Sequence, residues 1–262
     1  MTVPTQAAAL EIFDRILCGV DGTPESIEAA RQADRLRSLD GALEVAAVAD
    51  VDSAVHAGWA MGTVLQELES GAREALHRAV DEVSPAATDL LAGGVVACLL
   101  QQIEQGSATL LAVGPRGHSR AAGILMGGVA TELLHRTPCS VLLARKPRFG
   151  AFPSSILVGV DGSPQSVAAA AVAASLADRY DAELVVVAAT GGNGVEAEPI
   201  RELAPDFVTD PRHPVGALSE LSREADLLVV GSRGLHGPKA LGSVSERVAH
   251  RAASSVLVVR SH

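Results

Sequence analysis

The stretch ILCGVDGTP at residues 16–24 decides the fold of this chain, because it returns almost unchanged as ILVGVDGSP at residues 156–164. Two further segments repeat in the same order. They are GPRG at 114–117 with GSRG at 231–234, and SVLLAR at 140–145 with SVLVVR at 255–260. Matching segments in a fixed order indicate two copies of one domain.

We expect the two copies to form domains over residues 1–146 and 147–262, joined by a proline-containing linker near residues 146–155. Each copy is long enough to bury a core of its own.

Each copy alternates apolar strands with helices. The run at residues 16–20 ends in Asp-Gly and is typical of a buried strand. Thr23-Pro24 supplies the hydroxyl cap and first-turn proline that begin a helix. Because such alternation implies parallel pairing and a sheet covered on both faces, the sequence predicts an α/β fold.

We expect two tandem doubly wound domains of the Rossmann-like class, each with a five-stranded parallel sheet. The first copy is expected to have strands at 16–20, 42–49, 88–91, 110–113 and 141–144, and helices at 24–39, 61–83, 95–105 and 129–136.

The spacing of the repeats shows where the copies differ. Asp21 and Asp161 are 140 residues apart, but Gly114 and Gly231 are only 117 apart, so the second copy lacks 23 residues. The deletion follows the second strand. We therefore expect the second domain to lack most of its second helix and to have a flexible loop from Gly191 onward.

Composition excludes several classes of partner. The formal net charge of −10 disfavours nucleic acid and anionic membranes, and 2% aromatic residues provide no stacking surface for single strands. The N-terminus lacks the regions of a signal peptide, and no stretch has the length of a membrane helix. Cys18, Cys98 and Cys139 form no CxxC pair and are expected to be reduced and mostly buried. We expect a cytoplasmic protein that binds neither nucleic acid nor membrane.

Two features converge on one edge of each predicted sheet. The first strand ends at Asp21 or Asp161, and the fourth ends in a glycine loop that leads into a helix. Ligands of doubly wound sheets bind at the carboxyl ends of strands, where the strand order reverses. Glycines let the backbone approach a ligand, and a helix N-terminus offers N–H groups to phosphate. An aspartate there can accept hydrogen bonds from a ribose or base, so these parts predict a nucleotide site.

With these strand aspartates and glycine loops, the chain resembles a tandem universal stress protein over almost its whole length. The family is similar to the adenine-nucleotide α-hydrolase-like proteins, and its ATP-binding members have a loop reading G-x2-G-x9-G-[ST]. The first copy matches this loop at Gly114, Gly117 and Gly127, but Gly128 and Ala130 stand where hydroxyl side chains are common.

The second copy departs from the pattern differently. It has the hydroxyls of Ser243 and Ser245, but only seven residues separate Gly234 from Gly242. A missing neutral hydrogen bond costs about 0.5–1.5 kcal/mol, whereas a displaced loop misplaces several donors together. We therefore expect the first copy to bind nucleotide more tightly.

The resemblance implies ATP as the ligand, with Mg²⁺ able to accompany it, and a set of nucleotide-binding residues in each copy. In the first copy they are Gly19, Asp21, Val48, Val113, Gly114, Arg116, Gly117, Gly127, Gly128 and Val129. In the second copy they are Gly159, Asp161, Val230, Gly231, Arg233, Gly234, Gly242, Ser243, Val244 and Ser245. The histidines show no metal-ligand spacing, so no protein-bound metal is expected.

Several of these residues also have structural interpretations, which stay open. Asp21 and Asp161 precede glycine and can simply shape a turn. Ser243 begins the capping box SVSE and can simply start its helix. Loop side chains that suit either phosphate or solvent are Arg116, His118, Arg233 and His236.

The sequence contains no Walker loop with its Lys, no paired catalytic carboxylates and no supported Ser-His-Asp arrangement. We expect a stress-response protein that binds ATP or a related adenine nucleotide as a regulatory ligand. Two alternatives stay open: a nucleotide-free interaction module with degenerate pockets, and a slow ATPase whose water-activating group is not evident.

The last strand of each copy, at 141–144 and 256–259, is apolar, and an exposed edge of that kind invites pairing. Tandem fusion supplies the partner at high effective concentration. We expect the two halves of one chain to pair as an intramolecular pseudo-dimer. Two whole chains can associate further as a homodimer.

Overall fold

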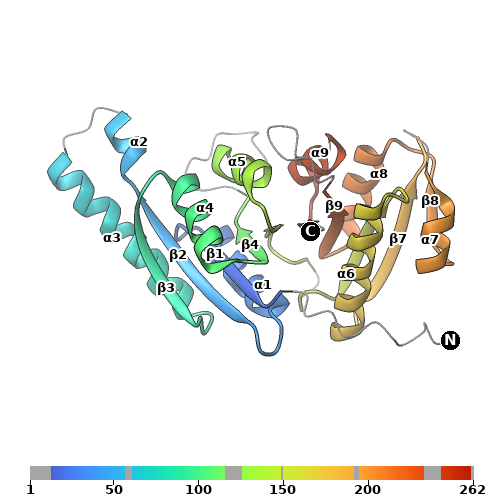
Figure 1. Cartoon of the computed structure of the whole chain (residues 1–262), viewed down its shortest axis with the longest axis horizontal. Helices are drawn as coiled ribbons and strands as arrows, with labels where there is room; N and C mark the ends of the chain where they lie inside the picture. Colours follow the sequence, from blue (N-terminus) through green and yellow to red (C-terminus); the bar gives the residue numbers. More distant parts are fainter. Residues whose placement is uncertain are drawn as a thin grey trace.

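The computed structural model describes residues 13–56, 61–115, 126–148, 150–191, 195–232 and 243–260. Within these residues ten strands form one sheet in the order β3-β2-β1-β4-β5-β10-β9-β6-β7-β8 (Figure 1). The strands are β1 (Arg15–Val20), β2 (Ala42–Asp50), β3 (Ala87–Gly93), β4 (Leu110–Val113), β5 (Ser140–Leu143), β6 (Ser155–Val160), β7 (Glu183–Ala189), β8 (Val208–Asp210), β9 (Leu227–Gly231) and β10 (Ser255–Val259). The helices are α1 (Pro24–Leu36), α2 (Val51–His56), α3 (Met61–Val80), α4 (Val95–Gly106), α5 (Gly128–Arg136), α6 (Pro164–Tyr180), α7 (Ala197–Leu203), α8 (Pro214–Leu221), the 3-10 turn η1 (Ser222–Glu224) and α9 (Ser243–Arg251).

Both faces of the sheet are buried, because successive strand residues face two different cores. In β1, Ile16 and Cys18 pack in a core shared with α1 and α3, while Leu17 packs in a core shared with α4 and α5. None of these three side chains is more than 2% exposed. This burial explains why the strands are continuous apolar runs, as expected of parallel strands covered on both sides.

Helix α1 begins where the sequence predicts. The Thr23 hydroxyl accepts a hydrogen bond from the Ser26 N–H at 3.3 Å, and Pro24 occupies the first turn. The helix ends at Leu36, earlier than predicted, because Arg37 has an extended backbone (φ −61°, ψ 138°). The cap places the N-terminus of α1 directly beside the end of β1.

The two halves have the same topology. The first half is ordered β3-β2-β1-β4-β5 and the second β8-β7-β6-β9-β10, with every pair inside a half parallel. The prediction of tandem doubly wound α/β domains is confirmed. The domain boundaries at 146 and 147 stay a prediction, although β6 begins where the predicted linker ends.

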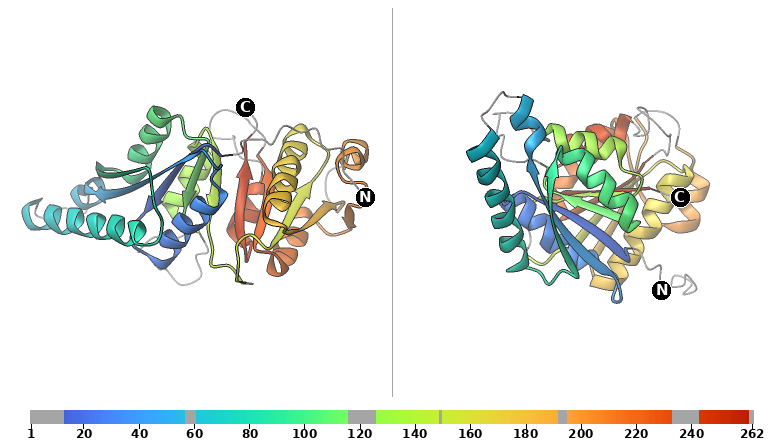
Figure 2. Two further views of the ribbon diagram at one scale, coloured as in Figure 1. Left: turned by 90° about the horizontal axis from the view of Figure 1, so that it is seen from below. Right: turned by 60° about the vertical axis from the view of Figure 1, so that its left-hand side comes forward.

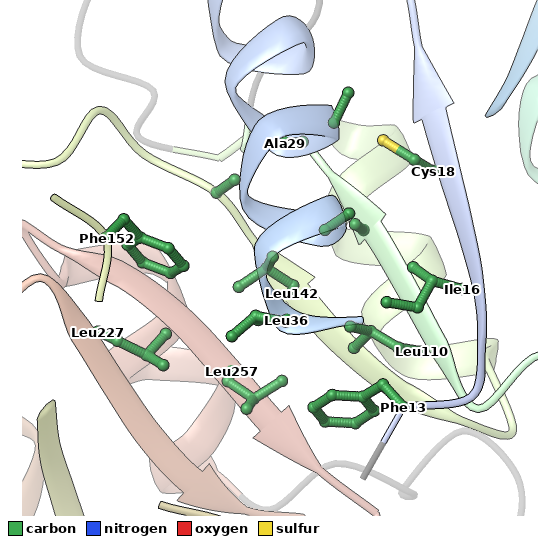
Figure 3. Close-up of a cluster of buried hydrophobic side chains, with 14 of the residues drawn as sticks. Phe13, Ile16, Cys18, Ala29, Leu36, Leu110, Leu142, Phe152, Leu227 and Leu257 are labelled. Atoms are coloured by element: carbon green, nitrogen blue, oxygen red, sulfur yellow. The ribbon is translucent and has the colours of Figure 1, made fainter. Parts of the chain in front are cut away.

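The halves meet at β5 and β10, which pair antiparallel. Leu142 lies directly opposite Leu257, and each is the third residue of the repeated SVL segment. The two residues are therefore equivalent, and an approximate twofold axis passes between them. Both are fully buried, and they share a cluster with Leu36 of α1 (Figure 3).

Two matched arginines fasten this junction. The Arg145 N–H donates to the Ser255 hydroxyl at 2.9 Å, and the Arg260 N–H donates to the Ser140 hydroxyl at 3.1 Å. Each guanidinium also donates to a carbonyl of the other half, in α9 at 2.7 Å for Arg145 and in α5 at 2.8 Å for Arg260. The sheet is thus continuous from one half into the other (Figure 2).

The structure corrects three local predictions. The helix expected at 61–83 is α3, which ends at Val80, and the short helix α2 precedes it. The six residues of α2 are too few for a periodic signal; Asp50 supports its start by accepting the Ser53 N–H at 3.2 Å.

In the second half, the region expected to be a loop includes helix α7, of which Ile200 is buried in the core. As predicted, that half has nothing as long as α3 at this place in its described residues.

The described helices include none with both the length and the apolar character needed to span a membrane.

Leu257→Ala should lower the free energy of unfolding by about 2–5 kcal/mol, because it leaves a cavity at the junction of the halves. Leu39→Ala is the matched control, since Leu39 is 91% exposed and the change should stay within about 0.5 kcal/mol. Urea unfolding followed by circular dichroism measures both. Equal effects of the two substitutions would contradict the packing described for Leu257.

Candidate functional site

A pocket of about 450 Å³ lies at the carboxyl ends of the first-half strands. It sits where the strand order reverses, because the chain leaves β1 toward β2 while β4 lies on the other side. Ligands of doubly wound sheets bind at such a switch point. The pocket is lined by Gly19, Val20, Asp21, Ser26, Ala46, Val48, Asp50, Glu67, Leu68, Gly71, Ala72, Val95, Leu99, Val113, Gly114, Pro115, Gly127, Gly128, Val129 and Ala130.

The site residues predicted for the first half come together here. Those that line the pocket are Gly19, Asp21, Val48, Val113, Gly114, Gly127, Gly128 and Val129. Their role in binding nucleotide stays a prediction. Arg116, Gly117 and His118 lie outside the described residues.

Asp21 has the structural role that the sequence left open. Its Oδ1 accepts the Thr23 N–H at 3.0 Å and the Thr23 hydroxyl at 2.6 Å, while its own N–H donates to the Ser26 hydroxyl at 3.2 Å. These bonds hold the turn between β1 and α1. A carboxylate has about four acceptor positions and can hold more than one partner.

Gly114 is required by close packing. A Cβ at this position would lie 3.1 Å from the carbonyl carbon of Glu25 and from the backbone nitrogen of Ser26. Backbone atoms at that distance leave no room for a larger side chain. The end of β4 therefore rests on the first turn of α1.

The N-terminus of α5 forms another wall. Gly127 caps this helix with an extended backbone, and its N–H donates to the Pro115 carbonyl at 2.8 Å. This bond ties together the two ends of the glycine loop. A Cβ on Gly128 would meet no atom of the described residues within 4 Å, so within them there is room for a side chain at the start of α5.

Helix α3 forms one wall of the pocket, and the sequence analysis predicted none of its lining residues. Glu67, Leu68, Gly71 and Ala72 line the pocket from this helix. The 23-residue difference between the copies was the available sign that this helix matters to the first half, because the second half lacks it. Asp50, which ends β2, also lines the pocket.

The second half repeats this turn after β6, and the hydroxyl of Ser245 in α9 bonds to the backbone. The Oδ1 of Asp161 accepts the Ser163 N–H at 3.0 Å and the Ser163 hydroxyl at 2.6 Å. The Ser245 hydroxyl, which is 6% exposed, donates to the Gly231 carbonyl at 2.7 Å. This predicted ligand contact thus serves the fold.

The other predicted residues of the second half are distributed as follows. Gly159 lies in β6 and Val230 in β9. Ser243 is the first residue of α9, and Val244 packs against the core that contains Leu17. Those outside the described residues are Arg233, Gly234, His236 and Gly242.

The three cysteines are free, and Cys18 and Cys139 are buried, as the sequence predicts. Burial raises the pKa of both these thiols to about 12. Cys98 is half-exposed; burial, Asp52 and Asp50 raise its pKa as well. Over the described part of the chain, no group of three or more His, Cys, Asp or Glu side chains is placed to hold a metal ion.

Fold and pocket together define an α/β protein of paired doubly wound domains, with a ligand-sized pocket at the switch point of the first. The model of the universal stress protein family matches residues 12–145 and 207–260. The chain belongs to this family.

Individual relatives support the same assignment. A universal stress protein of Mycolicibacterium smegmatis is 32% identical, with 94% of this chain and 96% of the relative covered. One from Mycobacterium bovis is 28% identical, with 94% of each covered. A crystal structure of a universal stress protein from Archaeoglobus fulgidus has the same fold, with a TM-score of 0.74 at 21% identity over 94% of this chain and 96% of that one.

In the folded protein Cys98 should be the one thiol per chain that reacts with a disulfide reagent. It should do so slowly at pH 8 and faster as the pH rises, because its raised pKa keeps most of it protonated at pH 8. Cys18 and Cys139 should react only after unfolding, because burial blocks access and keeps them protonated, whereas the thiolate is the nucleophile. Absorbance of the released thiol measures the count. Cys98→Ser should remove this reaction, and a second reactive thiol in the folded chain would contradict the burial described.

Proposed function

We propose that this protein binds an adenine nucleotide, ATP in the first instance, as a regulatory ligand in the pocket of its first half. The observation that carries the proposal is the convergence of Asp21, Gly114 and Gly127 on one pocket at the strand-order switch point. The chain's resemblance to ATP-binding universal stress proteins rests on these same positions.

The phosphates would lie at the start of α5. The first N–H groups of a helix have no partner within the helix, and the helix dipole adds partial positive charge there. Gly127 and Gly128 at this helix start line the pocket. Backbone donors of this kind are fixed in advance and favour an anion without any catalytic group, which suits a regulatory ligand.

The nucleoside would lie toward β1 and β2. Asp21 and Asp50 offer carboxylate acceptors to ribose hydroxyls or to an amino group of the base, and Val48 offers apolar surface. The described residues that line the pocket include no Lys or Arg. We therefore propose that Mg²⁺ accompanies ATP and offsets the charge of its phosphates.

A second candidate function is a protein-interaction module. The observation that favours it is in the second half, where the Ser245 hydroxyl is engaged by Gly231 rather than turned to a ligand. A cytoplasmic location and a working pseudo-dimer of the two halves belong to our proposal, and a slow ATPase activity is the remaining alternative.

Gly128→Ser should strengthen ATP binding by up to about tenfold, because it restores a hydroxyl donor worth about 0.5–1.5 kcal/mol at a position with room for it. Titration calorimetry with Mg·ATP measures the change. Gly128→Ala is the matched control, since it adds the same Cβ without the hydroxyl. If the serine and alanine variants bind alike, the hydroxyl at position 128 does not reach the phosphates, which contradicts their proposed position in front of α5.

Gly114→Val should abolish ATP binding, because its side chain must displace the first turn of α1. Gly114→Ala is a milder form of the same change. Gly216→Val is the control, since a Cβ on Gly216 meets nothing within 4 Å. Thermal melting checks that each variant is folded. Wild-type ATP affinity in a folded Gly114→Val protein would contradict the proposed position of the phosphates in this pocket.

A further inference from the structure

The two outer strands of the sheet, β3 and β8, differ in length (Figure 1). β8 has three residues, whereas β3 has seven and pairs with β2 from end to end without a bulge. Natural sheets protect an exposed edge with a short strand, a bulge, a proline or charged side chains, above all lysine. The sequence of β3, ATDLLAG, contains neither proline nor lysine and has one charged residue. β3 therefore lacks the usual protection of an edge strand.

The charged residue of β3, Asp89, is held against helix α4. The Nε2 of Gln102 in α4 donates to the Asp89 Oδ2 at 3.2 Å and to the Glu44 Oε1 at 3.2 Å. Helix α4 itself has one charged residue, Glu104, although 20% of the residues of the chain are charged. Because the cores of protein interfaces are depleted in charged residues, β3 and α4 together have the composition of an interface.

The helices on either side of β3 are fastened near β1, which lies two strands further into the sheet. In α3, the Arg78 guanidinium donates to the carbonyl of Gly22, just after β1, at 3.2 Å. At the end of α4, the Ser107 carbonyl accepts the Nε–H of Arg15 in β1 at 2.9 Å. Among the described residues no further strand pairs with β3, so its outer side is open to another strand.

The exposed side chains of β3 form a symmetric stripe. Thr88, Leu90 and Ala92 lie on one face of the strand, because side chains alternate along it. All three are exposed, Leu90 by 38%. The leucine stands in the middle with a smaller residue on each side. An antiparallel copy of β3 centred on Leu90 would therefore set leucine opposite leucine and threonine opposite alanine.

The chain already uses this mode of pairing once. β5 and β10 are equivalent strands of the two halves, and they pair antiparallel with Leu142 opposite Leu257. A twofold axis lets two identical strands make the same contacts with each other, and such an interface closes after two copies.

We propose that two copies of this chain associate through β3, antiparallel about Leu90, so that the sheet continues from one copy into the other. The occupant of the edge is a second copy because the stripe on β3 is complementary to itself. The other edge, β8, offers only three residues for further pairing. The proposal is independent of nucleotide binding.

The first experiment is sedimentation velocity of the full chain over a wide range of concentration. A reversible dimer is the expected result. Leu90→Lys should weaken dimerisation by about tenfold or more, because it removes the central contact and sets like charges opposite each other. Leu39→Lys is the matched control, since it makes the same change at a position that is 91% exposed and lies before β2.

Two results of this experiment overturn the proposal. One is a dimer that the Leu90 and Leu39 variants weaken equally. The other is a monomer at every concentration, which leaves the edge to an extended segment of another protein.

The second experiment tests the register. In a Cys98→Ser background, Leu90→Cys should form a disulfide between copies under mild oxidation, because the Cβ atoms of directly opposite residues lie about 4.5–5.5 Å apart. Leu39→Cys should not. A folded dimer of the Leu90→Cys variant that gives no cross-link overturns the register about Leu90.

Hydrogen exchange on the unmodified chain decides the proposal if the Leu90 variants fail to fold. The amides of β3 should exchange more slowly at concentrations where the dimer forms, and those of β8 should be unchanged. Exchange in β3 that does not depend on concentration overturns the proposal.

Discussion

The antiparallel pairing of β5 with β10 is the constraint on which the rest of the structure depends. It buries Leu142 against Leu257 and covers an edge that each half would otherwise expose. Strands within a half are parallel, so an antiparallel junction makes the two sets of strands run in opposite directions. The carboxyl ends of β1 and β4 therefore lie at one edge of the common sheet, and those of β6 and β9 at the other.

The junction also reaches the pocket through one helix. Ser26 in the first turn of α1 lines the pocket, and Gln32 lies further along the same helix. Gln32 is 1% exposed; its amide donates to the Arg145 carbonyl at 2.7 Å and accepts the Ser255 hydroxyl at 2.8 Å. The counterpart in α6, at the repeat spacing of 140 residues, is the apolar Val172. Helix α1, whose first turn lines the pocket, is thus bonded to Ser255 of the second half through a side chain that Val172 does not match.

Sequence reasoning predicted what short segments determine. The strands of the repeats, the Thr23 cap and the glycine at the end of β4 follow from residue type and spacing, and the structure has them where expected. The six-residue helix α2 has no periodic signal, and α7 depends on packing Ile200 against a core assembled from distant segments. The repeat offset showed that a wall was missing in the second half. It did not show that Glu196 would bond to Asp161, because that contact depends on the path of the chain across the sheet.

A half that loses its α3 must still cover its strand ends, since the apolar residues of β6 and β7 would otherwise meet water. Helix α7 packs Ile200 into this core, and the Glu196 N–H just before the helix donates to the Asp161 carbonyl after β6. An open pocket is the opposite solution, because its lining forgoes contacts that a packed core would make, and cavities in proteins reduce stability. The nucleotide that we propose for the first-half pocket would offset this cost, because a ligand that binds the folded state stabilises it. In the second half the approach that matches Gly114 is closer, since a Cβ on Gly231 would lie 2.5 Å from the backbone of α6. The two copies therefore differ in packing: the first has a pocket lined in part by α3, and the second extends the sheet and bonds to Gln32 through Ser255.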